Sequence, residues 1–228
     1  RSEHFQRHMF STWRSDYYHG LLAKARAAAE AGFDEVIFDA SRKPFEENMR
    51  ETKQAVEILR SMRPDIVVEG EVGYIGSSSE IVDSVPPQSL QLTTPEEAAQ
   101  FVTETKVDVF APVVGNMHGL LPSMIRGEGH KRLDIERIRE IKRASGAFLT
   151  LHGGPGTADG DFVAGIQAGL TIIHINTELR VAWRLGLESS LKAHAHDVTP
   201  YKILPGAEQA MEDVIARRLA LFNPDGRS

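Results

Sequence analysis

The chain has 228 residues, with 26 basic and 32 acidic side chains, a formal net charge of −6 and no cysteine. The acidic balance argues against a nucleic-acid-binding module, and the lack of a polybasic block or a bilayer-length apolar run argues against a membrane partner. Without cysteine there are no disulfides, thiolate zinc sites or cysteine nucleophiles, which fits a cytoplasmic protein.

Apolar runs and segments of helical period alternate along the chain, after an opening helix expected over residues 21–31. The apolar runs, which are typical of buried parallel strands, cover residues 35–40, 66–72, 107–114, 147–151 and 171–175. The helices that follow them are predicted at residues 45–62, 94–105, 134–144, 159–168 and 178–191, with a last helix at about 207–222. The pattern therefore predicts five β/α units.

Five β/α units indicate an α/β protein of the TIM (β/α)8 barrel type, built as a single domain over residues 1–228. A closed barrel usually needs about 250 residues, and residues 1–16 contain no clear strand, so we expect the first strands to be missing from this sequence or unusually built. The alternative is an open doubly wound sheet. Polar residues at the ends of all five strands favour the barrel, because an open sheet concentrates its site at one switch point.

Polar side chains stand at the carboxyl ends of the predicted strands, which converge on one mouth in a barrel. In chain order they are Asp39, Glu69, Glu71, His118, His152, His174 and Asn176. His118 and His152 each follow an apolar strand and precede glycine. Imidazole and carboxylate ligands suit zinc or another borderline divalent ion, and the glycines let backbone N–H groups approach an anionic substrate.

Several of these residues have a second interpretation. Asp39 can cap the turn before Ser41 instead of binding a metal. Either Glu69 or Glu71 can be the ligand, because both lie on one face of a strand, where a buried carboxylate needs a cation or a basic partner. His174 can be a core histidine with its hydrogen bonds satisfied.

Five segments in order resemble the class II, metal-dependent ketose-bisphosphate aldolase family, which includes fructose- and tagatose-bisphosphate aldolases. The segments are AGFDEVIFDASRKPFEEN (31–48), VEGEVG (68–73), GNMHG (115–119), LHGGPG (151–156) and INTELR (175–180), so the resemblance covers about residues 32–191. It implies a (β/α)8 barrel that reversibly cleaves a phosphorylated ketose through a metal-stabilised enediolate. It also implies Zn²⁺ as the cofactor, with Co²⁺, Mn²⁺ or Fe²⁺ as alternatives, a sugar-phosphate substrate, and a homodimer or homotetramer.

The resemblance assigns roles by position. The metal ligands that it implies are His118 and His152, with Glu71 and Asp39 as carboxylates that hold or adjoin the ion. The substrate contacts that it implies are Gly119, Gly153, Gly154, His174, Asn176 and Thr177. The family's proton donor lies on the loop after the VEGEVG-like strand, where Glu80 is the candidate.

The chain also departs from the family pattern. The family's third histidine ligand directly follows its catalytic aspartate, but this sequence has no Asp-His dipeptide, and the nearest candidates are Asp16 as the base and His19 as the ligand. Pro155 stands in place of a family serine. A lysine often found after GNxHG is replaced by the sequence LLP at 120–122, so phosphate binding rests on backbone donors, with Arg126, Lys131 or Arg132 as candidate side chains.

These departures leave two alternatives to an active aldolase. One is a family member that has lost catalysis and serves as a partner subunit. The other is a different metal-dependent barrel lyase or epimerase that uses the same metal ligands.

Overall fold

The computed structural model describes residues 18–76, 81 and 91–223, in which strands and helices alternate. The strands are β1 (Glu35–Phe38), β2 (Val67–Val72), β3 (Val109–Pro112), β4 (Phe148–Leu151) and β5 (Leu170–Ile173). They form one parallel sheet in chain order, with β1 and β5 at its edges. This order has no reversal, as in a (β/α)8 barrel and unlike a doubly wound sheet. The predicted α/β fold of barrel type is confirmed.

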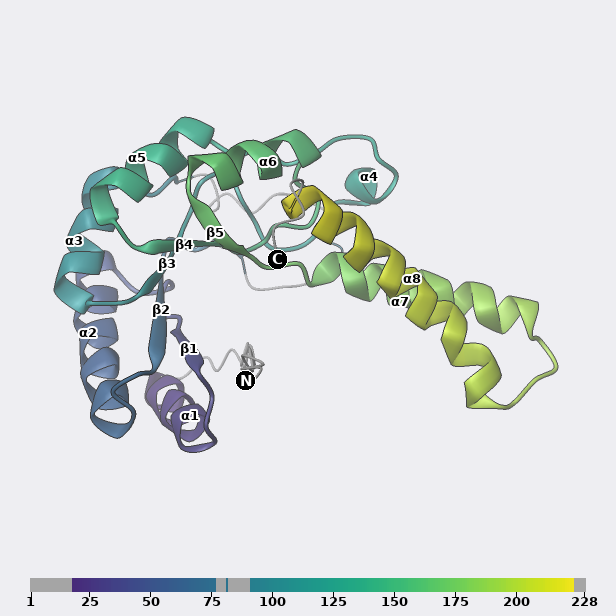
Figure 1. The fold of residues 1–228 in the computed structure, drawn as a ribbon, viewed down its shortest axis with the longest axis horizontal. Helices are drawn as coiled ribbons and strands as arrows, with labels where there is room; N and C mark the ends of the chain where they lie inside the picture. The colour runs from purple at the N-terminus through teal and green to yellow at the C-terminus, as the bar shows by residue number, and fades with distance from the viewer. Residues whose placement is uncertain (1–17, 77–80, 82–90, 224–228) are drawn as a thin grey trace, which may run out of the picture.

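The described helices are α1 (Tyr18–Glu30), α2 (Phe45–Met62), α3 (Pro95–Thr105), α4 (Pro122–Ile125), α5 (Ile135–Ser145), α6 (Asp159–Ala168), α7 (Thr177–Ala193) and α8 (Pro200–Phe222). The helices α1, α2, α3, α5 and α6 contact one another in that order and cover one side of the sheet, whereas α7 and α8 pair and extend away from it (Figure 1). None of the helices in the described part of the chain has the length and apolar character needed to cross a bilayer.

Local sequence signals explain where several helices begin and end. Helix α3 begins with a capping box, in which the Thr94 side chain accepts from the backbone N–H of Glu97 at 3.1 Å and the Glu97 carboxylate accepts from the backbone N–H of Thr94 at 2.8 Å. Helix α5 has Asp134 as its N-cap, and the side chain of this residue accepts from the backbone N–H of Arg137. The helix ends at Gly146, whose φ is +69°. These signals place the ends of the helices that separate the strands.

The largest difference between a predicted and an observed boundary is in α8, which begins at Pro200 rather than at about residue 207 and contains Pro205 within its length. Its packing against α7 is close: a Cβ on Gly186 would lie 2.7 Å from the carbonyl oxygen of Gly206. The Ser190 hydroxyl of α7 also donates to the carbonyl oxygen of Ile203 at 2.7 Å. Tertiary packing thus offsets the helix-breaking tendency of the proline.

Candidate metal centre

The side chains of Glu69 and Glu71 point away from the helical layer. Gly70, between them, faces that layer, because a Cβ there would lie 2.8 Å from the ring of Phe101 in α3. Since side chains alternate along a strand, the two glutamates share the opposite face of β2, and both are buried. A hydrogen bond from the side-chain amide of Asn48 in α2 to the carbonyl oxygen of Glu71, at 2.8 Å, secures the end of the strand.

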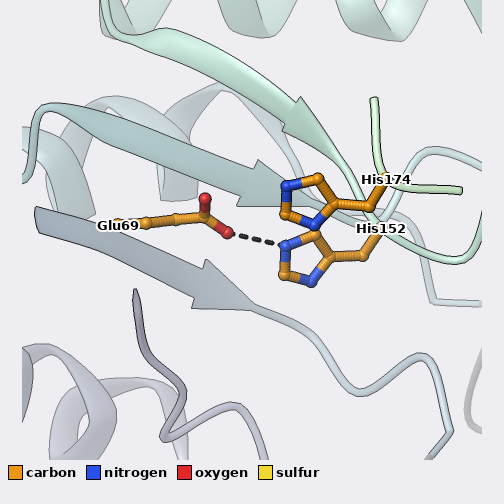
Figure 2. A group of neighbouring side chains, drawn as sticks. All are labelled: Glu69, His152 and His174. Carbon is orange, nitrogen blue, oxygen red and sulfur yellow. Dashed lines mark ion pairs between the residues drawn. The ribbon is translucent and has the colours of Figure 1, made fainter. Parts of the chain in front are cut away.

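His152 directly follows β4 and lies between the two carboxylates. Its Nε2 is 2.6 Å from Oε1 of Glu69, an ion pair drawn in Figure 2, and its Nδ1 is 3.0 Å from Oε2 of Glu71. The hydroxyl of Thr150, also on β4, donates to Oε2 of Glu69 at 3.2 Å. The buried imidazole is therefore oriented by acidic groups on a strand two positions away in the sheet.

His174 directly follows β5 and lies beside His152, with ring centroids 4.7 Å apart and an angle of 22° between the ring planes. Figure 2 shows the two imidazoles side by side, with the carboxylate of Glu69 reaching toward them from β2. Ligand atoms of Glu69, His152 and His174 all lie within 4.8 Å of one another. Two imidazoles and a carboxylate at such distances are a donor set that zinc prefers.

The charges in this cluster are strongly coupled. Burial, together with repulsion from Asp39, raises the pKa of Glu71 to about 7. Burial opposes charging of His152, but the carboxylates of Glu69 and Glu71 outweigh it and raise its pKa well above 6.5. Burial would raise the pKa of Glu69, yet the neighbouring His152 and His174 lower it. In this state a proton on His152 partly balances the buried carboxylates.

A divalent cation fits these residues. Within the described part of the chain, the buried Oε1 of Glu71 accepts no hydrogen bond, and Glu69 Oε1 and His152 Nε2 lack one of normal geometry despite their close approach. A buried polar atom left without a partner costs about 1–3 kcal/mol. A cation among these ligands would satisfy such atoms and replace the proton on His152.

The structure places two further predicted ligands near this group. His118 follows β3, with its ring centroid 6.2 Å from that of His152 and its Nδ1 2.9 Å from the carbonyl oxygen of Gly76. Asp39 follows β1 and accepts from both the backbone N–H and the hydroxyl of Ser41, at 3.0 and 2.6 Å. Asp39 thus caps the turn before Ser41, and its charge also acts on Glu71.

The predicted substrate contacts lie at the same end of the sheet. Gly153 follows His152 with φ +62°, and a Cβ there would lie 2.4 Å from the carbonyl oxygen of Met117. Gly119 also has positive φ, and a Cβ on Gly154 would lie 3.1 Å from the carbonyl oxygen of His174. Asn176 and the buried Thr177 stand at the N-terminus of α7.

The candidate cations for phosphate binding are engaged with other groups. Arg126 pairs with Glu128 at 2.8 Å, and Arg132 Nε lies 2.8 Å from Oδ2 of Asp161. The ammonium of Lys131 donates to backbone carbonyls.

Three predicted side chains cannot be compared with this site. Asp16 and Glu80 lie outside the described residues. His19 lies in the first turn of α1, and its side chain is likewise outside them.

The sequence did not single out Asn116, which lies in the GNMHG motif and is buried. Its amide nitrogen donates to the carbonyl oxygen of His152 at 3.0 Å, and its amide oxygen accepts from the backbone N–H of Val114 at 2.7 Å. It therefore ties the end of β3 to the residue at the centre of the cluster. Its place in a glycine-rich strand end was the only signal in the sequence.

Comparisons with known proteins bear on this geometry. The family model described as fructose-bisphosphate aldolase class-II matches residues 14–227. The sulfofructosephosphate aldolase of Alkalicoccus urumqiensis is 30% identical over 207 residues, which are 91% of this chain and 69% of that protein. The fructose-bisphosphate aldolase of Mycoplasma pneumoniae is 32% identical over 209 residues, covering 89% of this chain and 68% of that protein.

Solved structures give the same relationship. The crystal structure of the YdjI aldolase from Escherichia coli K12 has a TM-score of 0.69 and 28% identity, covering 88% of this chain and 65% of that one. A putative fructose-1,6-biphosphate aldolase from Coccidioides immitis has a TM-score of 0.70 and 26% identity, covering 90% and 69%. This chain thus spans about two thirds of its relatives' length. The sequence and structural matches together show that it belongs to the class II fructose-bisphosphate aldolase family.

Proposed function

We propose that this chain is a divalent-metal-dependent aldolase that reversibly cleaves a phosphorylated ketose. The observation that carries the proposal is the convergence of Glu69, His152 and His174 from three strands of the sheet, with ligand atoms within 4.8 Å of one another. Membership of an aldolase family supports the reaction type. The names of its relatives, fructose-bisphosphate aldolase and sulfofructosephosphate aldolase, support a phosphorylated ketose as the substrate.

The proposed ion is Zn²⁺, with Co²⁺, Mn²⁺ or Fe²⁺ as alternatives, held by three imidazoles with Glu69 beside them. His152 and His118 are the ligands that the resemblance implies, and we propose His174 as the third imidazole, because it follows β5 and its ring lies 4.7 Å from that of His152. The contact between His118 Nδ1 and the carbonyl oxygen of Gly76 supports His118 as a ligand, because such a hydrogen bond orients a ligating imidazole. When bound, the ion polarises the ketone carbonyl and stabilises the negative charge that develops on its oxygen.

The proposed phosphate site is built from backbone donors. Gly119, Gly153 and Gly154 let N–H groups approach an anion closely, and two of these glycines have positive φ. Asn176 and Thr177 add the N-terminus of α7, a helix of 17 residues whose first N–H groups have no intrahelical acceptor. The ketone would then lie between these donors and the imidazoles. Asp16 and Glu80 remain the predicted proton-transfer groups.

The test is to reconstitute the chain with Zn²⁺ and measure cleavage of fructose bisphosphate, tagatose bisphosphate and sulfofructose phosphate. We expect release of a triose phosphate from at least one of them, abolished by chelation and by His152→Ala but retained in His196→Ala, a change at an exposed histidine. Metal binding without cleavage of any ketose phosphate would instead support a partner subunit that has lost catalysis. Conversion without carbon–carbon cleavage would support an epimerase. The assembly as a homodimer or homotetramer stays a prediction.

A further inference from the structure

Lys131, in the segment before α5, is a buried lysine with an unusual set of partners. Its side chain is only 5% exposed. Its ammonium lies 2.7 Å from the carbonyl oxygen of Met117, 2.8 Å from that of Gly119, 3.1 Å from that of Gly153 and 2.6 Å from that of Pro155. An ammonium has three N–H donors, so these four oxygens saturate it.

The hydrogen-bond partners of the Lys131 ammonium are backbone carbonyl oxygens. None of the ion pairs among the described residues includes this ammonium. Burial lowers its pKa to about 7, whereas four converging carbonyl dipoles favour the charged form. Carbonyl oxygens directed at one point repel one another unless a cation lies between them, and proteins bind free metal cations through such oxygen clusters. Lys131 therefore acts as a cation tethered to the chain.

The four carbonyls belong to the two segments that carry the predicted histidine ligands. Met117 and Gly119 flank His118 on either side, and Gly153 and Pro155 stand one and three residues after His152. The backbone N–H of Lys131 also donates to the carbonyl oxygen of Gly156, in the segment that follows His152, at 2.8 Å. A single side chain thus joins the ends of β3 and β4.

We propose that Lys131 is a positioning residue whose ammonium locks the two glycine-rich segments together and places a positive charge behind the backbone that receives the substrate phosphate. The inference rests on the proposed function, since Gly119 and Gly153 are its proposed phosphate contacts. The positive charge acts on the substrate phosphate through the intervening peptide groups. The hydrogen bonds of the ammonium fix the spacing of His118 and His152. Loss of the ammonium should raise KM for the phosphorylated ketose more than it lowers kcat.

The first test compares Lys131→Met, which keeps length but removes charge, with Lys192→Ala, a change at an exposed lysine of α7. With zinc content matched, we expect Lys131→Met to raise KM by about tenfold or more, because the charge-assisted hydrogen bonds that hold the two segments are lost. We expect Lys192→Ala to leave KM unchanged. A wild-type KM in Lys131→Met would overturn the proposal.

The second test uses Lys131→Ala, which leaves the carbonyls without their cation. Methylammonium or potassium chloride should restore KM and raise Tm, relative to an equal concentration of tetramethylammonium chloride, whose cation is too large and has no N–H donor. An equal response to all three salts would contradict a cation-specific role. If Lys131→Ala does not fold in any salt, the KM of Lys131→Met decides the question.

The Tm comparison also separates this inference from the proposed function. If the wild type cleaves no ketose phosphate, the proposed function fails. A cation-specific rise in the Tm of Lys131→Ala would still support the role of the ammonium in holding the two glycine-rich segments together. If the wild type is active but neither KM nor Tm responds to the cation, the inference fails while the proposed function stands.

Discussion

The Nδ1 of His152 lies 3.0 Å from Oε2 of Glu71, inside the protein and at the ends of two different strands. This contact ties the protonation of an imidazole to that of a carboxyl group whose pKa is already raised to about 7. A divalent ion that binds His152 must displace a proton held by this pair. Metal binding, stability and pH are therefore linked at this site.

The first prediction concerns pH. Glu71 has a folded pKa of about 7 against 4.5 as its ordinary value, and the pKa of His152 is also raised. Both groups bind more protons in the folded than in the unfolded chain, so the metal-free protein should lose stability as pH rises above about 4.5 and through the folded pKa values. Zn²⁺ replaces those protons, so the rise in Tm that it causes should grow between about pH 5.5 and 8. Thermal unfolding with and without zinc measures both trends.

Glu71→Gln provides the control for this linkage, because glutamine keeps the shape of the side chain and cannot titrate. In the metal-free variant, the fall in stability between about pH 4.5 and 7 should become shallower. An unchanged pH profile in Glu71→Gln would show that other groups cause the effect.

The second prediction concerns the proposed ligands that flank His152. His118→Ala and His174→Ala should each weaken zinc binding by at least about tenfold, because each would remove an imidazole from the proposed ligand set. His130→Ala, at an exposed position, should bind zinc as the wild type does. The affinities follow from competition with a chelator of known strength. Wild-type affinity in His174→Ala would remove this residue from the ligand set.

The third prediction concerns the close approach of two backbones. Gly153→Ala would place a Cβ 2.4 Å from the carbonyl oxygen of Met117, at φ +62°. Gly146→Ala has a similar φ of +69° but nothing within 4 Å. Both variants lose about 1–2 kcal/mol for the left-handed backbone, and only Gly153→Ala adds a clash of about 1–3 kcal/mol. The difference between the free energies of unfolding of the two variants, measured by urea titration, gives the cost of the clash. Equal losses of stability in both variants would contradict it.

The fourth prediction concerns Asn116, which joins the backbones of Val114 and His152. Asn116→Ala should lower the free energy of unfolding by about 1–3 kcal/mol, because it leaves buried backbone groups without partners. Gln209→Ala, at an exposed position of α8, should change it by less than about 0.5 kcal/mol. Denaturant titration of both variants gives the comparison. A loss in Asn116→Ala no greater than in Gln209→Ala would contradict the role of the amide.

The sequence predicts well those features that local signals encode. The predicted helices at residues 45–62 and 159–168 coincide with α2 and α6, since charged and apolar positions repeat with the helical period and turns interrupt them. The prediction of His118, His152 and His174 as site residues rests on a signal of the same kind, because each stands where an apolar strand ends. The five matching motifs also led to the family that the comparisons show.

Features that depend on tertiary contacts could not be predicted in the same way. The early start of α8 depends on close packing against Gly186 of α7. Pro205, which lies inside α8, instead predicts a break in the helix at that point of the sequence. Asn116 and Lys131 act on backbone carbonyls of segments that only the fold brings together, and a carbonyl has no signature in the sequence. The choice of Glu69 as the carboxylate nearest both His152 and His174 required atomic distances, because Glu69 and Glu71 share one face of β2.

The most direct test of the metal centre is a titration of the metal-free chain with Co²⁺, followed by visible absorption, in the wild type, His152→Ala and His196→Ala. We expect about one ion per chain with the intense bands of a low-coordinate site in the wild type and His196→Ala, and loss of these bands in His152→Ala. The same bands in His152→Ala as in the wild type would contradict a metal centre built around this imidazole.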